Sequence, residues 1–143
     1  MKSYMLIAII LITIWSCNVG PKAINYGADA CHYCSMTIVD RQHASQLVTE
    51  KGKVFKFDAT ECMMNHANEV DRQSIAMFLA NDYNMPGELI DATKATFLIS
   101  KNIPSPMGEY LTAFSNQTKA QTAQIENGGE LLTWEELQKR FTN

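Results

Sequence analysis

The segment Cys31–Met36 constrains this chain most, because it places two cysteines and a methionine within six residues. His32 lies between the two cysteines. Thiolate and thioether sulfurs are soft donors, which select Cu(I) over hard cations. Zinc sites and dithiol redox sites also use Cys-x-x-Cys, but neither needs the methionine at position 36. The spacing therefore predicts a turn that binds a soft metal ion.

The first 16 residues are typical of an export signal rather than of a folded segment. One lysine precedes an apolar run from Met5 to Trp15, which is too short to cross a bilayer comfortably. The run ends in Ser16 and Cys17, which resembles a bacterial lipobox. We expect residues 1–16 to be a signal peptide, Cys17 to be lipidated, and the protein to be a periplasm-facing membrane lipoprotein. In the alternative, an ordinary signal peptide, Cys17 is incidental.

The charge pattern and the known catalytic motifs exclude several classes of function. Removal of Lys2 takes the net charge from −3 to −4, and no basic stripe exists, so we expect no nucleic-acid partner. The chain has no G-x-S-x-G elbow, no H-E-x-x-H pair and no glycine-rich phosphate loop. We therefore predict that the protein is not an enzyme.

The hydrophobic pattern predicts an α+β fold. Strands are expected at 37–39, 44–49, 54–57, 95–99, 110–114 and 131–132, while 75–80 is either a buried strand or a short helix. A turn is expected at Pro86-Gly87. Helices are expected after Asp58, whose capping box includes Glu61, at 116–126 after a Ser115 cap, and after Thr133, whose capping box includes Glu136.

This order of elements places a ββαβ pattern in both halves of the chain. We expect two small related modules that pack together, since neither is large enough to bury much surface alone. The expected boundaries are a lipid-anchored tether at 17–30, a first module with the metal motif at 31–87, and a second module with a C-terminal helix at 88–143.

A second set of soft donors follows the cysteine motif. The Asp58 cap would place Cys62 near a helix N-terminus, which lowers the pKa of a thiol. His66 lies four residues later on the same helical face. The candidate metal ligands are Cys31, Cys34, Met36, Cys62, Met63, His66 and His43. Met63 can instead be a core residue, because methionine commonly fills gaps in cores.

Two other uses of these residues compete with copper binding. Cys31, Cys34, Cys62 and His66 would also make a Cys₃His zinc site that stabilises a small module. A thiol–disulfide protein would use Cys31 and Cys34, but its motif normally opens a helix, whereas β-type residues follow Met36 here. An odd number of cysteines after Cys17 leaves at least one thiol that is either reactive or protected by a metal.

Several segments, in order, resemble the NosL family. They are 34–40, 46–48, 53–58, 61–63, 90–95, 103–108 and 128–130, and the similarity covers nearly all of 31–136. The resemblance implies a fold of two ββαβ modules. It also implies a lipoprotein accessory factor that delivers Cu(I) to the copper–sulfide centre of nitrous oxide reductase, with the apo-enzyme as partner.

The resemblance carries over most directly to Cys34 and Met36, which match the Cys-x-Met of the family. A histidine ligand is also implied, and His43 and His66 compete for that role. Cys31 and Cys62 look like features of only some members. Family members commonly have glycine where Ser35 stands.

Overall fold

The computed structural model describes residues 18–142, so the expected signal peptide and Cys17 lie outside the described residues. The strands are β1 (Ser45–Thr49), β2 (Val54–Phe57), β3 (Ile75–Asp82), β4 (Met85–Asp91), β5 (Thr96–Ile99), β6 (Leu111–Phe114) and β7 (Glu130–Leu132). The helices are α2 (Thr60–Glu69), α3 (Gln117–Asn127) and α4 (Trp134–Thr142), with 3₁₀ turns at Arg72–Ser74 and Ala92–Lys94. No helix within residues 18–142 is long and apolar enough to cross a membrane.

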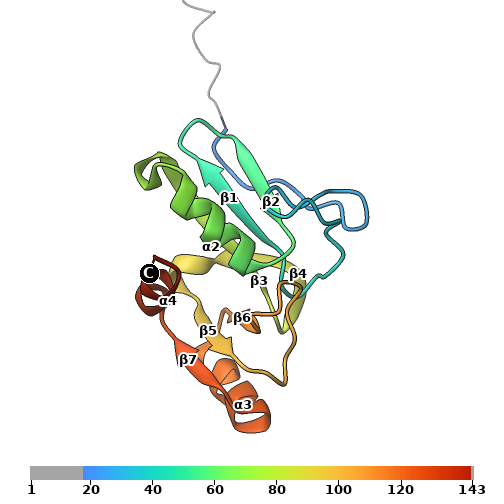
Figure 1. The fold of residues 1–143 in the computed structure, drawn as a ribbon, viewed down its shortest axis with the longest axis vertical. Coiled ribbons are helices and arrows are strands. Elements are labelled where there is room, and N and C mark those ends of the chain that lie inside the picture. Colours follow the sequence, from blue (N-terminus) through green and yellow to red (C-terminus); the bar gives the residue numbers. More distant parts are fainter. Residues whose placement is uncertain (1–17, 143) are drawn as a thin grey trace, which may run out of the picture.

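Two antiparallel sheets form the framework (Figure 1). The first has the strand order β2-β1-β3-β4 and the second has the order β6-β5-β7. In each sheet a hairpin and a helix precede a strand that pairs with the first strand of the hairpin. The expected α+β fold with two related ββαβ modules is therefore confirmed.

Strand β4 is an addition to the first module. Its Pro86-Gly87 pair, expected to form a turn, lies inside the strand, and the turn occurs at 83–84 instead. An edge strand tolerates proline because one side of it makes no ladder hydrogen bonds. The boundary expected between residues 87 and 88 thus falls within β4, and the first sheet extends to Asp91.

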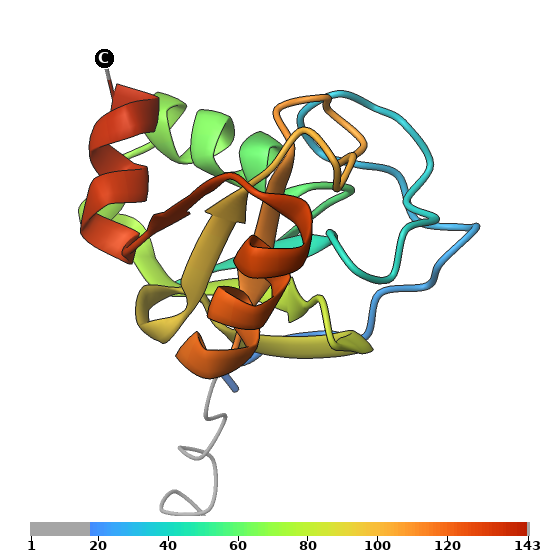
Figure 2. The same ribbon diagram turned by 90° about the horizontal axis from the view of Figure 1, so that it is seen from below.

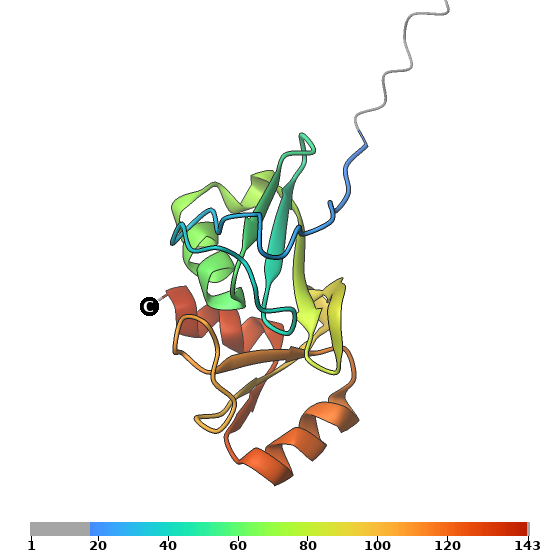
Figure 3. The ribbon, with the colours of Figure 1, turned by 90° about the vertical axis from the view of Figure 1, so that its right-hand side faces the viewer.

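The two modules share one hydrophobic core. Helix α4 packs between α2 and the second sheet (Figure 3), while α3 covers the outer side of that sheet (Figure 2). The Trp134 ring lies 5.0 Å from the ring of Phe78 in the first sheet and 6.1 Å from the ring of Phe97 in the second. Burial of these aromatic side chains joins the modules, because neither sheet covers them alone.

From Lys22 onward, the segment that was expected to be a tether at 17–30 contacts the first sheet. The Lys22 N–H donates to the side-chain oxygen of the buried Gln46 at 3.1 Å, and Lys56 Nζ donates to the Ala23 carbonyl at 2.6 Å. Helix α2 packs on the same two strands. Because side chains alternate between the faces of a strand, β1 is buried on both faces.

The predicted strand at 37–39 forms only an isolated bridge between Thr37 and Ala30. The segment 75–80 is the first part of strand β3. Gly129 lies so close to β5 that a Cβ there would be 2.2 Å from the Ile99 carbonyl oxygen, so the end of α3 requires glycine.

Two of the three predicted helix caps are wrong. The N-cap of α2 is Ala59, which has no side-chain cap bond, while Asp58 and Glu61 make tertiary contacts instead. Helix α3 is capped by Asn116, whose Oδ1 accepts from Thr118 N at 2.8 Å, because Ser115 donates its hydroxyl to Asp82.

The capping box of α4 is confirmed. Thr133 N donates to Glu136 Oε2 at 2.7 Å, and Glu136 N donates to Thr133 Oγ1 at 3.3 Å. Both residues are exposed, and within residues 18–142 their side chains form hydrogen bonds only with each other's residue. Local sequence therefore decides this helix start.

Candidate metal centre

The cysteine motif forms a loop closed by its own backbone. Cys31 N donates to the Met36 carbonyl at 2.7 Å, and Ser35 N donates to the Cys31 carbonyl at 2.9 Å. Ser35 has a φ of +65°, in the left-handed region that favours glycine. His32 N fastens the loop to β2 by donating to the Lys56 carbonyl at 2.8 Å. These bonds fix the positions from which both cysteines project.

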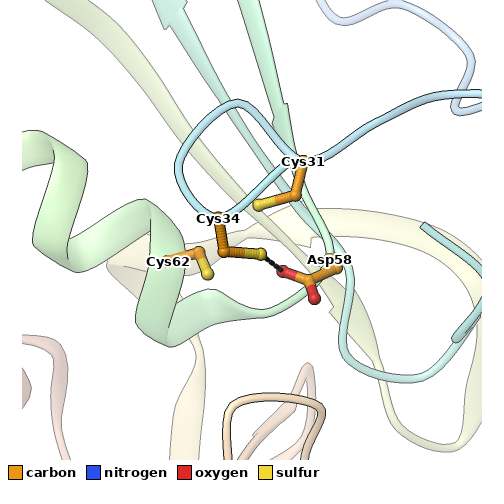
Figure 4. Close-up of side chains that lie close together, drawn as sticks. All are labelled: Cys31, Cys34, Asp58 and Cys62. Atoms are coloured by element: carbon orange, nitrogen blue, oxygen red, sulfur yellow. Dashed lines mark hydrogen bonds between the residues drawn. The ribbon is translucent and has the colours of Figure 1, made fainter. Parts of the chain in front are cut away.

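The loop brings its cysteines against the junction between β2 and α2 (Figure 4). Sulfur atoms of Cys31, Cys34 and Cys62 and a carboxylate oxygen of Asp58 all lie within 4.8 Å of one another. We call these four residues the thiol cluster. Asp58 directly follows β2, and Cys62 lies in the first turn of α2. All three cysteines are free thiols.

The thiol cluster has a buried and an accessible side. Cys31 is 2% exposed, Cys62 is 0% exposed and Asp58 is 2% exposed, whereas Cys34 is half-buried. Met36, in the same loop, is 50% exposed. The cluster is therefore accessible to solvent from the Cys34 side.

The pKa values of the two buried thiols shift in opposite directions. A hydrogen bond from the Cys62 thiol lowers the pKa of Cys31 to about 6, which makes Cys31 the thiolate acceptor. The same hydrogen bond, together with burial, raises the pKa of Cys62. Burial raises the pKa of Cys34 as well. The expectation of a Cys62 thiolate is wrong, because burial and the Cys31 thiolate outweigh the effect of the helix N-terminus.

Asp58 is the member of the thiol cluster that the sequence reasoning missed. Its Oδ1 accepts a hydrogen bond from Cys34 Sγ at 3.5 Å. Its Oδ2 is buried and has no hydrogen-bond partner among residues 18–142. The interpretation of Asp58 as a helix cap hid this role. The available signal was its position four residues before Cys62, immediately after an apolar strand.

The structure places the other predicted ligands differently. Met63 is fully buried in the hydrophobic core. His43 has both ring nitrogens engaged, Nδ1 at 2.8 Å from Asp40 Oδ2 and Nε2 at 3.4 Å from Thr112 Oγ1. His43 is therefore not part of the thiol cluster, and its tertiary contacts explain its burial.

His66 lies in α2 among aromatic rings rather than among the cluster atoms. Its ring is 4.9 Å from the rings of His32 and Phe55 and 5.5 Å from that of Phe57. Burial lowers its pKa, and the neighbouring His32 lowers it further. The fourth position expected for His66 in a Cys₃His set is occupied by Asp58 in the thiol cluster.

Comparisons with known proteins identify the family to which the chain belongs. The chain is 28% identical to the copper-binding lipoprotein NosL of Stutzerimonas stutzeri, and the match covers 78% of this chain and 63% of the relative. In fold it is similar to the crystal structure of the copper chaperone NosL from Shewanella denitrificans, with a TM-score of 0.73, 23% identity, and coverage of 82% of this chain and 95% of the other. The NosL family model matches residues 22–142, and the protein therefore belongs to the NosL family.

Proposed function

We propose that this protein is a copper chaperone that carries Cu(I) at the thiol cluster, with Cys34 and Met36 as the exchangeable ligands. The observation that carries the proposal is the convergence of three thiols within 4.8 Å, one of them half-buried and followed two residues later by an exposed methionine. Thiolate and thioether donors select Cu(I). Relatives named as a copper-binding lipoprotein and a copper chaperone support the same cargo.

Exposure of one side of the thiol cluster suits handover of the ion. A ligand atom of the protein that receives the copper approaches Cu(I) from the side of Met36 and Cys34. Cys31 and Cys62 are covered by protein. Ligand exchange needs such an open position, whereas a closed tetrahedral site retains its ion. Binding releases the Cys34 proton, since the thiolate is the metal ligand.

The proposed acceptor is apo-nitrous oxide reductase, which receives copper for its copper–sulfide centre. This proposal rests on the family resemblance, and the proposed location is the periplasmic face of a membrane, through a lipid on Cys17. In a deletion strain grown on nitrous oxide at low copper, the wild-type gene should restore growth. The double variant Cys34→Ser, Met36→Ala should not restore it at equal protein level, and full rescue would remove the chaperone assignment.

Zinc is the second candidate cargo, because three thiols and one carboxylate also make a tetrahedral donor set. Anaerobic competition titrations with chelators for each ion distinguish the two. The wild-type protein should bind Cu(I) more tightly than Zn(II). Cys34→Ser should weaken Cu(I) binding by more than about tenfold, while Ser35→Gly, which suits the φ of +65°, is the matched control in the same loop.

A thiol–disulfide function has less support from the geometry. The residue after Met36 forms an isolated β-bridge rather than opening a helix. A reactive redox cysteine needs access to solvent, and the thiolate acceptor, Cys31, is buried. If the wild-type protein reduced insulin disulfides and bound no Cu(I), the redox function would replace the copper function.

A further inference from the structure

The buried half of the thiol cluster holds donors that one copper ion at Cys34 and Met36 leaves unused. Cys31 and Cys62 approach Cys34 from the protein side, one from the loop and the other from α2 (Figure 4). Both thiols are almost completely buried. Cys34 thus has two buried thiols within 4.8 Å and an exposed methionine two residues later in its own loop.

We propose that the thiol cluster binds two Cu(I) ions, an outer ion at Cys34 and Met36 and an inner ion at Cys31 and Cys62, with the Cys34 thiolate bridging them. This inference rests on the proposed function and adds the number of copper ions that each chain carries. Each ion replaces thiol protons: an S–H bond breaks, an S–Cu bond forms, and the proton leaves to solvent. Copper stays Cu(I) throughout, so no oxidant or reductant is needed.

The spacing of the sulfurs suits such an arrangement. Metal–thiolate bonds to zinc are about 2.3 Å long, so an ion of similar bond length joins two sulfurs up to about 4.6 Å apart. The cluster atoms already lie within 4.8 Å of one another. Small side-chain rotations therefore suffice to place one ion between Cys31 and Cys62 and another beside Cys34.

The buried carboxylate of Asp58 is compatible with a second cation in this position. Asp58 is 2% exposed, and its carboxylate forms none of the ion pairs found in the described part of the chain. A buried carboxylate oxygen without a partner is costly, and buried charges are normally paired or bound to metal. Because the second Cu(I) replaces the proton of the Cys62 thiol, its binding leaves the net charge of the thiol cluster beside this carboxylate unchanged.

The test is an anaerobic Cu(I) titration of the mature chain, combined with X-ray absorption spectroscopy of the loaded protein. We expect two tightly bound Cu(I) ions per chain and a copper–copper scattering shell. Cys31→Ala and Cys62→Ala should each retain one ion and lose that shell. Ser45→Ala is the control, because it removes a buried hydrogen bond to the Ala59 carbonyl beside α2 without removing a metal donor.

The outcomes separate this inference from the proposed function. One Cu(I) per chain in the wild type, without a copper–copper shell, overturns the inner position and leaves the chaperone function intact. The same holds if Cys62→Ala keeps both ions. No tight Cu(I) binding by the wild type overturns the proposed function itself. The spectroscopy of the wild type decides the matter even if a cysteine variant fails to fold.

Discussion

The Cys34 thiol donates a hydrogen bond to Asp58 Oδ1 at 3.5 Å across 24 residues of sequence. This contact joins the cysteine loop to the point where β2 ends and α2 begins. It gives the accessible thiol a buried anionic neighbour, and that anion favours a bound cation over an empty site.

Asp58→Asn should therefore weaken Cu(I) binding by about 10–100-fold, as is typical for loss of a group that supports metal ligands. The amide retains the size and one oxygen acceptor but loses the negative charge. A competition titration at constant pH measures the effect. Asp91→Asn, at the far end of β4 and outside the thiol cluster, should leave the affinity unchanged. Equal affinities for both variants and the wild type would mean that Asp58 is a structural neighbour only.

Substitutions at Ser35 should separate loop geometry from ligand chemistry. Its φ of +65° costs a β-branched residue about 1–3 kcal/mol. Ser35→Val should lower the free energy of unfolding by that amount and weaken Cu(I) binding, while Ser35→Gly should do neither. Urea denaturation and copper titration of the two variants give both values. A Ser35→Val protein as stable as the wild type would show that the loop adopts another conformation in solution.

Glu61 should make stability depend on pH. Burial raises its pKa above the ordinary value of 4.5, although hydrogen bonds from Ser105 and the Leu111 N–H oppose the shift. The folded state thus prefers the protonated form of Glu61. The contribution of this preference to the free energy of unfolding is fully present below pH 4.5 and is lost as the pH rises through the raised pKa.

Glu61→Gln should remove this dependence, since the amide keeps an oxygen acceptor and does not ionise. The unfolding free energy of the variant relative to the wild type should increase as the pH rises from 4.5, as measured by urea denaturation at a series of pH values. Asp71→Asn, on an exposed turn, provides the reference for a surface carboxylate. A difference that stays constant over the series would contradict the raised pKa.

His43→Leu should reduce stability without changing copper binding. The substitution leaves the part-buried Asp40 carboxylate without its 2.8 Å imidazole partner, and loss of such a hydrogen bond costs about 0.5–1.5 kcal/mol. Cu(I) affinity should equal that of the wild type, because His43 lies outside the thiol cluster. Thermal unfolding and copper titration are the two readouts. A large loss of Cu(I) affinity in a folded variant would indicate that His43 is a copper ligand.

Lipidation of Cys17 should hold the protein in the membrane fraction, since each buried acyl CH₂ contributes about 0.8 kcal/mol. Cys17→Ser should yield an unprocessed or soluble protein that still folds, because residues 18–142 contain both sheets. Fractionation followed by mass spectrometry of the N-terminal peptide measures both outcomes. An unmodified, soluble wild-type chain would exclude the lipoprotein assignment.

Local sequence was sufficient where a residue interacts mainly with its neighbours. The Thr133–Glu136 capping box, the hairpin of β1 and β2 and the repeated ββαβ order all follow from short-range patterns. The Cys-x-x-Cys-x-Met spacing likewise determined the donor chemistry, since side-chain softness is a property of residue type.

Only the tertiary structure decided which of these donors meet. Asp58 and Glu61 have the spacing of a capping box, yet the former contacts Cys34 and the latter contacts Ser105 and Leu111, because buried carboxylates require partners wherever the fold supplies them. The opposite pKa shifts of Cys31 and Cys62 likewise follow from burial and from a contact that the fold creates. Sequence by itself determined the types of donor atoms that are available to a metal ion, whereas burial and long-range contact decided their positions, their charge and their access to solvent.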